Sequence, residues 1–171
     1  MREVTLRIAT EEDVEPLGMI HRAAMRGHVE KTWGWDEAWQ TAFFREHFPF
    51  GQRQVIERGG ETAGLLDVVR HEDHIELANI MIAPRYHRMG IGSTLIRQLQ
   101  EEARASRMPL RLQVLKVNVE AKKLYDRLEF ERCGETETHF LMRWLPSGSG
   151  TTSAADGATL AQGSARTRGP S

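Results

Sequence analysis

Residues 75–93 read IELANIMIAPRYHRMGIGS and combine a strand, a glycine-containing turn and the start of a helix. The first eight are mostly apolar, which predicts a buried strand, and the following proline ends it because proline cannot donate a ladder hydrogen bond. From Ile91 onward, apolar residues recur with helical spacing. A helix N-terminus carries unpaired N–H groups and a partial positive charge, and Gly90 and Gly92 would let an anion approach closely. The pattern indicates a phosphate cradle, although an ordinary glycine loop before a helix would read the same way.

Composition narrows the class of protein. The 171 residues fit one domain with a substantial core, and 23 Lys+Arg against 24 Asp+Glu give no electrostatic case for nucleic acid or an acidic membrane. The single cysteine, Cys133, excludes an intramolecular disulfide and a cysteine-rich metal site, and we expect no metal. With no signal-peptide pattern and no apolar run of about 20 residues, a cytoplasmic protein is expected.

Hydrophobic patterning predicts further elements on both sides of this segment. The expected strands lie at 4–8, 53–57, 63–69, 110–114 and 139–145, with an irregular one near 131–133. Thr10, Asp36 and Asn118 are favoured N-cap residues for three more helices, the first of which we expect to break at Gly27. Short turns favour antiparallel pairing, but the strand after the long helix should pair in parallel through a right-handed crossover. The predicted sheet is therefore mixed.

Three of the four tryptophans lie between residues 33 and 39. The helical spacing of Trp39 and Phe43 predicts the buried face of the second helix. Trp33 and Trp35 come before or at its start, where a substrate-binding aromatic wall and simple packing are equally compatible with the sequence. Exposed aromatic residues in this region would also offer a surface for a homodimer.

The composition changes abruptly at Pro146, after which Gly, Ser, Thr and Ala dominate. Such a segment cannot bury enough apolar surface to offset the entropy of ordering it. We therefore expect one domain over residues 1–146 and a disordered tail over residues 147–171.

The opening segment resembles the acyl-CoA motif of the GNAT superfamily of N-acetyltransferases. That motif is a strand ending in x-Val/Ile-x-Pro, followed by Gln/Arg-x-x-Gly-x-Gly/Ala at a helix start. Residues 82–84 and 87–92 match it, except that His87 stands where glutamine or arginine is usual.

A second GNAT motif, Asn-x-x-Ala-x-x-Leu-Tyr-x-x-x-Gly-Phe, lies further along the chain. It is matched in register by Asn118, Ala121, Leu124, Tyr125 and Phe130. Glu129 replaces the usual glycine, which would alter the way the helix ends. Two motifs in the expected order are far more specific than either one alone.

The resemblance implies an α/β (α+β) fold: a mixed, mostly antiparallel sheet, splayed between two central parallel strands and flanked by helices. Acetyl-CoA would lie in the gap, its pantetheine arm along the strand and its pyrophosphate on the backbone of the turn. The cofactor-binding residues implied are Met81, Ile82, His87, Arg88, Met89, Gly90, Ile91, Gly92, Ser93 and Asn118. Arg88 could equally be a solvated surface charge, and Asn118 could be only a helix cap.

The implied activity is transfer of an acetyl group from acetyl-CoA to a primary amine by direct attack in a ternary complex. The amine could belong to a small molecule, an amino acid, a peptide or a protein. Tyr125 would protonate the departing thiolate, since a phenol with a pKa of about 10 is protonated at neutral pH. Glu76, directed to the strand face opposite Ile75, is our candidate base, with His74 a weaker one. The alternatives are a catalytically silent acyl-CoA sensor, in which His87 and Glu129 mark drift, or a phosphate-binding regulatory module.

Overall fold

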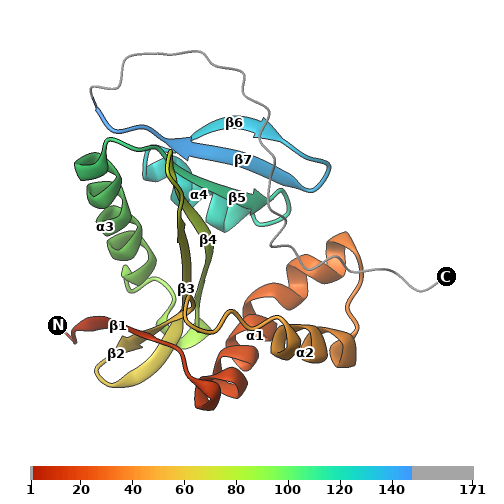
Figure 1. Cartoon of the computed structure of the whole chain (residues 1–171). Helices are drawn as coiled ribbons and strands as arrows, with labels where there is room; N and C mark the ends of the chain where they lie inside the picture. The colour runs from red at the N-terminus through yellow and green to blue at the C-terminus, as the bar shows by residue number, and fades with distance from the viewer. Residues whose placement is uncertain (1, 148–171) are drawn as a thin grey trace.

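The computed structural model describes residues 2–147, so most of the predicted tail lies outside the described residues. Seven strands form one sheet with the order β1-β2-β3-β4-β5-β7-β6 (Figure 1). The strands are β1 (Val4–Ile8), β2 (Gln54–Arg58), β3 (Glu61–Arg70), β4 (Ile75–Ile82), β5 (Leu110–Leu115), β6 (Glu131–Glu135) and β7 (His139–Trp144). The helices are α1 (Val14–Thr32), α2 (Glu37–Glu46), α3 (Ile91–Ser106) and α4 (Val119–Arg127), with short 3₁₀ turns η1 (Glu11–Asp13) and η2 (Pro84–Tyr86).

The sheet is mixed, as the sequence predicts, because β4 and β5 are parallel and the other neighbours are antiparallel. These two central strands stay paired over only three residue pairs, which end at Leu77 and Leu112. Beyond that point β4 continues to Ile82 and β5 to Leu115 without further pairing between them. The predicted splay between the two central strands is therefore confirmed.

A β-bulge in β4 coincides with the point where the strands separate. Asp67 of β3 lies opposite Asn79, whereas its neighbour Val68 lies opposite Leu77, so Ala78 is an extra residue on β4. A bulge bends a strand and increases its local twist. The bend in β4 thus begins immediately after its last residue paired with β5, Leu77.

The helices cover the two faces of the sheet in pairs (Figure 1). On one face, Arg104 of α3 lies over the ring of Trp144, and Lys122 of α4 lies near the ring of Phe140. On the other face, Trp33 at the end of α1 contacts His139 of β7, whose side chain points away from those of its neighbours in the strand. The core lies between sheet and helices, and no helix within residues 2–147 has the length and apolar character that crossing a bilayer requires.

Two local predictions are wrong, and one is confirmed in detail. Helix α1 does not break at Gly27 but continues to Thr32, because tertiary packing outweighs the roughly 1 kcal/mol cost of one helical glycine. Helix α2 buries Gln40 and Phe44 rather than Trp39 and Phe43, which are only half-buried. Its predicted cap is confirmed: the side chain of Asp36 accepts a hydrogen bond from the Trp39 N–H at 2.9 Å.

Candidate active site

The turn between β4 and α3 presents a series of free backbone N–H groups. The His87 N–H is used by the Pro84 carbonyl, and the first bond of the helix runs from the Thr94 N–H to the Gly90 carbonyl. Between them, the N–H groups of residues 88–93 have no hydrogen-bond partner within the described part of the chain. Unpaired N–H groups at the start of a 16-residue helix attract anions. Of the predicted cradle, residues 88–93 can offer N–H groups and His87 cannot.

The two glycines of this turn are there for different physical reasons. Gly90 has φ 78°, in the left-handed region that favours glycine. Gly92 has no such backbone requirement, and a Cβ added to it would meet only the Leu124 side chain, at an ordinary contact distance of 3.8 Å. The protein therefore does not need glycine at position 92 for its own packing. The missing side chain leaves room above the helix N-terminus for a bound group.

Arg88 also has a left-handed backbone, with φ 61°. A non-glycine residue in this region carries strain, which tends to occur at functional sites. The guanidinium is exposed and has no partner among residues 2–147, so it is free to contact an anion held by the turn. The predicted phosphate contact for Arg88 thus stays a prediction with a suitable geometry.

Backbone groups of β4 beyond the bulge face the gap at alternate residues. The Ala83 N–H donates to the Ala63 carbonyl of the β3 side at 2.8 Å, and in an antiparallel pair every second residue makes such bonds. Met81 therefore directs its N–H and C=O toward β3, while Ile80 and Ile82 direct theirs away from β3, into the gap. The Met81 backbone is therefore paired with β3 in this structure. Ile80, which the sequence reasoning missed, takes its place beside Ile82.

His87 occupies one of these gap-facing groups. Its Nε2 lies 2.8 Å from the Ile82 carbonyl oxygen, which makes Ile82 the acceptor of a hydrogen bond from the imidazole. The side chain is exposed and therefore free to move away. His87, the residue that departs from the motif, is thus hydrogen-bonded to the strand that the resemblance leads us to expect will bind pantetheine.

Tyr125 and Asn118 lie on α4, on the side of the sheet that faces α3. The Asn118 side chain caps the helix by accepting a hydrogen bond from the Ala121 N–H at 3.2 Å, which confirms the predicted cap. Tyr125 is 7 % exposed, and its ring meets that of Phe130 edge-on with 5.7 Å between centroids. Burial raises the pKa of Tyr125 to about 12. Its hydroxyl has no hydrogen-bond partner among the residues that the structure describes.

Glu76 lies on the opposite side of the sheet, near the start of β4. Its face is that of Asn79 and Met81, which α1 and α2 cover, and its side chain is 26 % exposed. The carboxylate oxygen lies 3.1 Å from Nε2 of His71, in the turn between β3 and β4. The weaker candidate, His74, is engaged by Asp73, whose carboxylate lies 2.6 Å from His74 Nδ1. Of the two candidates, Glu76 keeps a carboxylate oxygen that is not committed to a partner.

The two candidate substrate tryptophans flank the end of α1. Trp33 packs on His139 with 6.4 Å between ring centroids, and burial lowers the pKa of His139. Since His139 pairs with Leu115, this contact lies at the end of β5 that borders the gap. Trp35 is half-buried and donates from Nε1 to Glu37 at 2.6 Å. Trp33 therefore borders the gap, while Trp35 is held by the first residue of α2.

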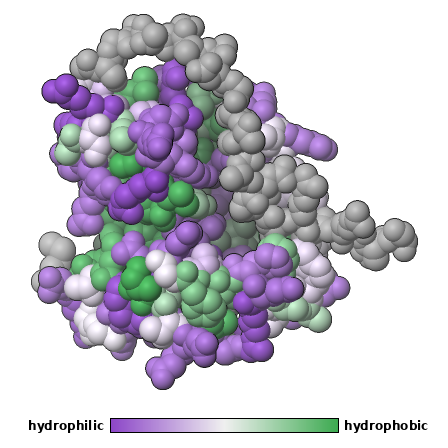
Figure 2. Space-filling model, viewed as in Figure 1, coloured by the Kyte–Doolittle hydropathy of each residue, from purple (hydrophilic) through white to green (hydrophobic). Residues whose placement is uncertain are grey.

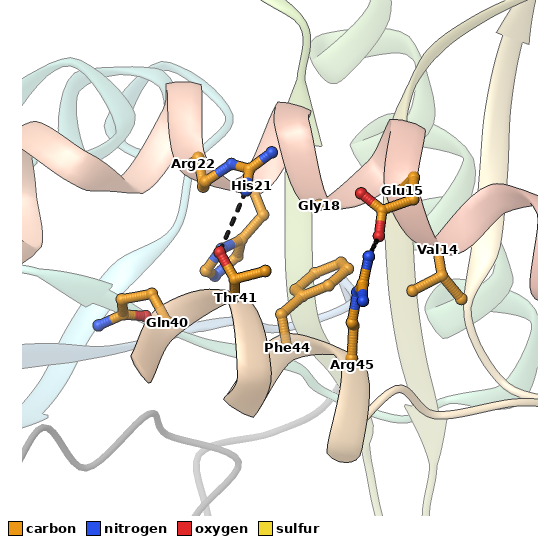
Figure 3. A pocket seen from close by; sticks show the side chains of 9 residues that line it. All are labelled: Val14, Glu15, Gly18, His21, Arg22, Gln40, Thr41, Phe44 and Arg45. Atoms are coloured by element: carbon orange, nitrogen blue, oxygen red, sulfur yellow. Dashed lines mark hydrogen bonds and ion pairs between the residues drawn. The ribbon is translucent and has the colours of Figure 1, made fainter. Parts of the chain in front are cut away.

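In the space-filling view, apolar residues reach the surface in the middle of the face and again in its lower part, among hydrophilic residues (Figure 2). A pocket between α1 and α2 is lined by His21, Phe44 and other residues of the two helices (Figure 3). It is closed by the Arg22–Thr41 hydrogen bond and the Arg45–Glu15 ion pair. Burial lowers the pKa of His21 to about 4, so the imidazole in this pocket is neutral at pH 7.

Comparison with known proteins agrees with this geometry. A model of the Acetyltransferase (GNAT) family matches residues 10–130, and no curated protein matches the chain. Among solved structures, the PaiA N-acetyltransferase of Thermoplasma acidophilum in complex with coenzyme A is similar at 16 % identity and a TM-score of 0.68, covering 84 % of this chain and 99 % of that one.

Two further structures share the fold. The ribosomal-protein-S18-alanine N-acetyltransferase of Escherichia coli is 21 % identical, with a TM-score of 0.60 over 86 % of this chain and 97 % of that one. Arabidopsis thaliana NAA60, solved with a bisubstrate analogue, is 16 % identical, with a TM-score of 0.58 over 86 % of this chain and all of that one. At these identities the likeness supports the fold and not a particular acceptor.

Proposed function

This chain belongs to the GNAT family of acetyltransferases, and from that premise we propose that it moves an acetyl group from acetyl-CoA to a primary amine by direct attack in a ternary complex. The observation that carries the proposal is the split between β4 and β5 beside a helix N-terminus with six free N–H groups, residues 88–93. The unpaired backbone groups of β4 suit the extended arm of a thioester, and the N–H groups at the end of this strand suit its diphosphate.

Binding would use mostly backbone groups. The N–H groups of residues 88–93 suit a diphosphate, and Arg88 suits a charge-assisted contact to one of its oxygens. The amide-containing pantetheine arm would pair with Ile80 and Ile82 as an added strand, as extended peptides pair with sheet edges. His87 must release the Ile82 carbonyl for that pairing to be complete. The Asn118 amide nitrogen, which capping leaves free, would contact the same arm.

The transition state places negative charge on the carbonyl oxygen of the thioester. A pre-placed N–H donor stabilises such an oxyanion far better than water does, because it needs no reorganisation. The N–H of Ile80 is the best candidate, since it faces the gap directly after the bulge. The alternation along the strand favours Ile80 over Met81, whose N–H is directed toward β3.

Tyr125 is suited to assist the leaving group. Its raised pKa keeps it fully protonated at neutral pH. A thiol has a pKa of about 8.5, so complete proton transfer from Tyr125 to a thiolate would be uphill. Tyr125 therefore acts best by donating a hydrogen bond to the sulfur as charge develops there, and its unpartnered hydroxyl is free to do so.

Proton removal from the amine is assigned to Glu76, directly or through water. An alkylammonium with a pKa of about 10.4 must lose a proton before it can attack. Glu76 lies on the α1 and α2 side of the sheet, where Trp33 and His139 border the gap, so an acceptor would enter from that side. Its hydrogen bond with His71 holds the carboxylate in place.

Turnover tests the proposal. The purified chain is incubated with acetyl-CoA and a panel of amines that includes small polyamines, amino acids, peptides with free N-termini and lysine-containing peptides. Mass spectrometry should detect an acetylated product, a gain of one acetyl group, that depends on the protein. Binding of acetyl-CoA without product from any amine would instead favour the acyl-CoA sensor. The hydrogen bond from His87 to the Ile82 carbonyl is the observation that favours this alternative. No association with acetyl-CoA at all would overturn both.

A further inference from the structure

The turn between β3 and β4 gathers three side chains that can ligate a metal ion. One ligand atom each from His71, His74 and Glu76 lies within 4.8 Å of the others. All three side chains are partly exposed, so an ion can reach them. Two imidazoles and one carboxylate form a ligand set used by zinc in open, three-residue protein sites. We propose that these residues form a zinc site, and that zinc bound there inhibits the acetyl transfer by taking up Glu76.

The distances suit the ion. Nε2 of His71 and Oε2 of Glu76 lie 3.1 Å apart. With metal–ligand distances of about 2.0–2.1 Å, two ligands of a tetrahedral zinc ion lie roughly 3.3 Å apart. The rings of His71 and His74 are stacked, with 4.2 Å between centroids. Binding requires only that these partly exposed rings turn about their side-chain bonds until a nitrogen of each points at the ion.

The turn itself holds the ligands together. The His71 N–H donates to the His74 carbonyl at 2.9 Å, which closes the loop and keeps the two imidazoles on one side. Glu76 follows two residues later, within β4. A short closed turn on the end of a hairpin is a rigid base for a site, so little ordering is needed on binding.

Asp73 supplies the supporting contact that such sites use. Its carboxylate lies 2.6 Å from Nδ1 of His74, which leaves Nε2 of that imidazole for the ion. Histidine ligands usually hold their second nitrogen on a carboxylate or carbonyl, and this contact orients the ring. The nearby positive charge is Arg111 of β5, the register partner of Glu76, which acts on the Asp73 carboxylate. The absence of cysteine ligands excluded only cysteine-rich sites, so this proposal revises our expectation that the chain binds no metal.

The inhibitory part of the proposal rests on the proposed role of Glu76. A carboxylate that ligates zinc cannot also accept the proton of an incoming amine. Zinc would therefore lower the acetylation rate without blocking acetyl-CoA, whose proposed cradle lies at the opposite end of β4.

Metal binding is measured first, without any activity. The chain is stripped with EDTA, dialysed and titrated with zinc chloride by calorimetry and with cobalt chloride by visible absorption. We expect one ion per chain, a rise in melting temperature with zinc, and a loss of at least tenfold in affinity in His71→Ala and in His74→Ala. Asp73→Ala should weaken binding about tenfold. His47→Ala, at an exposed histidine that caps the C-terminal end of α2, is the matched control and should bind as the unaltered chain does. Substoichiometric binding, or binding that survives both histidine substitutions, would overturn the site.

Activity is measured separately, as acetylated amine by mass spectrometry, because zinc binds the free thiol of coenzyme A and disturbs thiol assays. Each variant's rate with zinc is divided by its own metal-free rate. We expect at least a tenfold fall in the unaltered chain, reversed by EDTA, and a much smaller fall in His74→Ala. Stoichiometric binding with an unchanged rate would overturn the inhibition and keep the site. A chain without turnover would overturn the proposed function, while the binding titration would still decide the site.

Discussion

Arg53 and Asp67 form a buried two-pronged ion pair directly beside the bulge in β4. Nε and Nη2 of Arg53 donate to the two carboxylate oxygens of Asp67 at 2.9 and 2.7 Å, and the Asn79 amide donates to the same carboxylate at 3.0 Å. Phe44 of α2 and Phe48, which follows that helix, cover the guanidinium, at 5.1 and 4.9 Å from their ring centroids. Because Asn79 follows the extra residue of β4, this network fixes the bulge where the sheet divides.

Asp67→Ala should destabilise the protein by about 3–5 kcal/mol, because it leaves the buried charge of Arg53 without a partner. Asn79→Ala keeps the ion pair and should cost only about 1 kcal/mol. Urea unfolding at pH 7 measures both. If Asn79 holds the bulge, Asn79→Ala should also bind acetyl-CoA several-fold more weakly than the unaltered chain, although it loses little stability. Equal stability losses in the two variants would contradict this division of roles.

Gly92→Ala should leave stability unchanged or slightly higher, because alanine favours helices and its Cβ would meet only Leu124, at 3.8 Å. Acetyl-CoA should still bind this variant within a few-fold, because the motif takes either glycine or alanine at this position, whereas the large indole of Gly92→Trp should cover the helix N-terminus and lower the affinity at least tenfold in calorimetry. Gly90→Ala is the matched variant: it should lose about 1–2 kcal/mol of stability, since its φ of 78° is left-handed. A folded Gly92→Trp protein with unaltered affinity would show that this helix terminus does not carry the diphosphate.

Tyr125→Phe should lower kcat by about 10²-fold or more while the KM for acetyl-CoA changes little, because the hydroxyl is needed only as the sulfur departs. Stability should hardly change, since that hydroxyl has no partner to lose among residues 2–147. With its pKa raised to about 12, Tyr125 should also cause no loss of rate between pH 7 and 10. Tyr86→Phe, which removes the hydroxyl that donates to Glu61 at 2.5 Å, is the control. Equal kcat values for Tyr125→Phe and the unaltered chain would exclude the assignment.

Glu76→Gln should lower kcat by about 10²–10⁴-fold at pH 7, the range typical for a general base, with the affinity for acetyl-CoA within twofold. Glutamine keeps the size of the side chain but cannot accept the proton of the amine. The substitution is measured in metal-free buffer, so that zinc does not complicate the comparison. Glu72→Gln, an exposed carboxylate in the same turn, is the control. Full activity of Glu76→Gln would remove this residue from the reaction.

Stability should fall as the pH drops below about 6.5, because of His21. Its folded-state pKa of about 4 lies below its ordinary value of 6.5, owing to burial and, to a lesser degree, to Arg53 and Arg22. The unfolded chain therefore binds the proton first, so the stabilisation is full above pH 6.5 and is lost between pH 6.5 and about 4. The loss at pH 5 is on the order of 1–2 kcal/mol.

Comparing the urea midpoints at pH 7.5 and 5 tests this, and His21→Gln should show a clearly smaller difference than the unaltered chain. Asp13 does not interfere in that range. The hydrogen bond from Arg7 lowers the pKa of Asp13 from 3.8 to about 2, so its contribution is present above pH 3.8 and disappears only as the pH approaches 2. An identical pH dependence in the two proteins would mean that His21 is not the cause.

The features predicted correctly from sequence are those that depend on neighbouring residues. Asp36 and Asn118, both predicted as N-cap residues, do cap their helices. Glu129, which replaces the glycine of the second motif, has φ 65° and so occupies a backbone position that glycine would adopt without strain. The deviation from the motif was visible in the sequence, but the conformation it imposes was not.

What depends on distant contacts could not be predicted. Trp39 and Phe43 are more hydrophobic than Gln40, yet Gln40 is 2 % exposed, because helix α2 is rotated so that Phe44 covers Arg53. The extra residue at Ala78 leaves no signal in the sequence, although it decides which backbone groups of β4 face the gap. The backbone N–H and C=O groups of consecutive residues point to opposite edges of a strand, so Met81 and Ile82 cannot both direct theirs into the gap.

The split sheet also has a cost when no ligand fills it. Ile80 and the N–H of Ile82 face the gap without a partner on β5, and such groups form a template on which a stray peptide or a second chain can add a strand. By occupying the Ile82 carbonyl, His87 blunts that template. A thioester lying along β4, as proposed, would cover the rest of it, so the ligand-free protein should be the form most prone to aggregate.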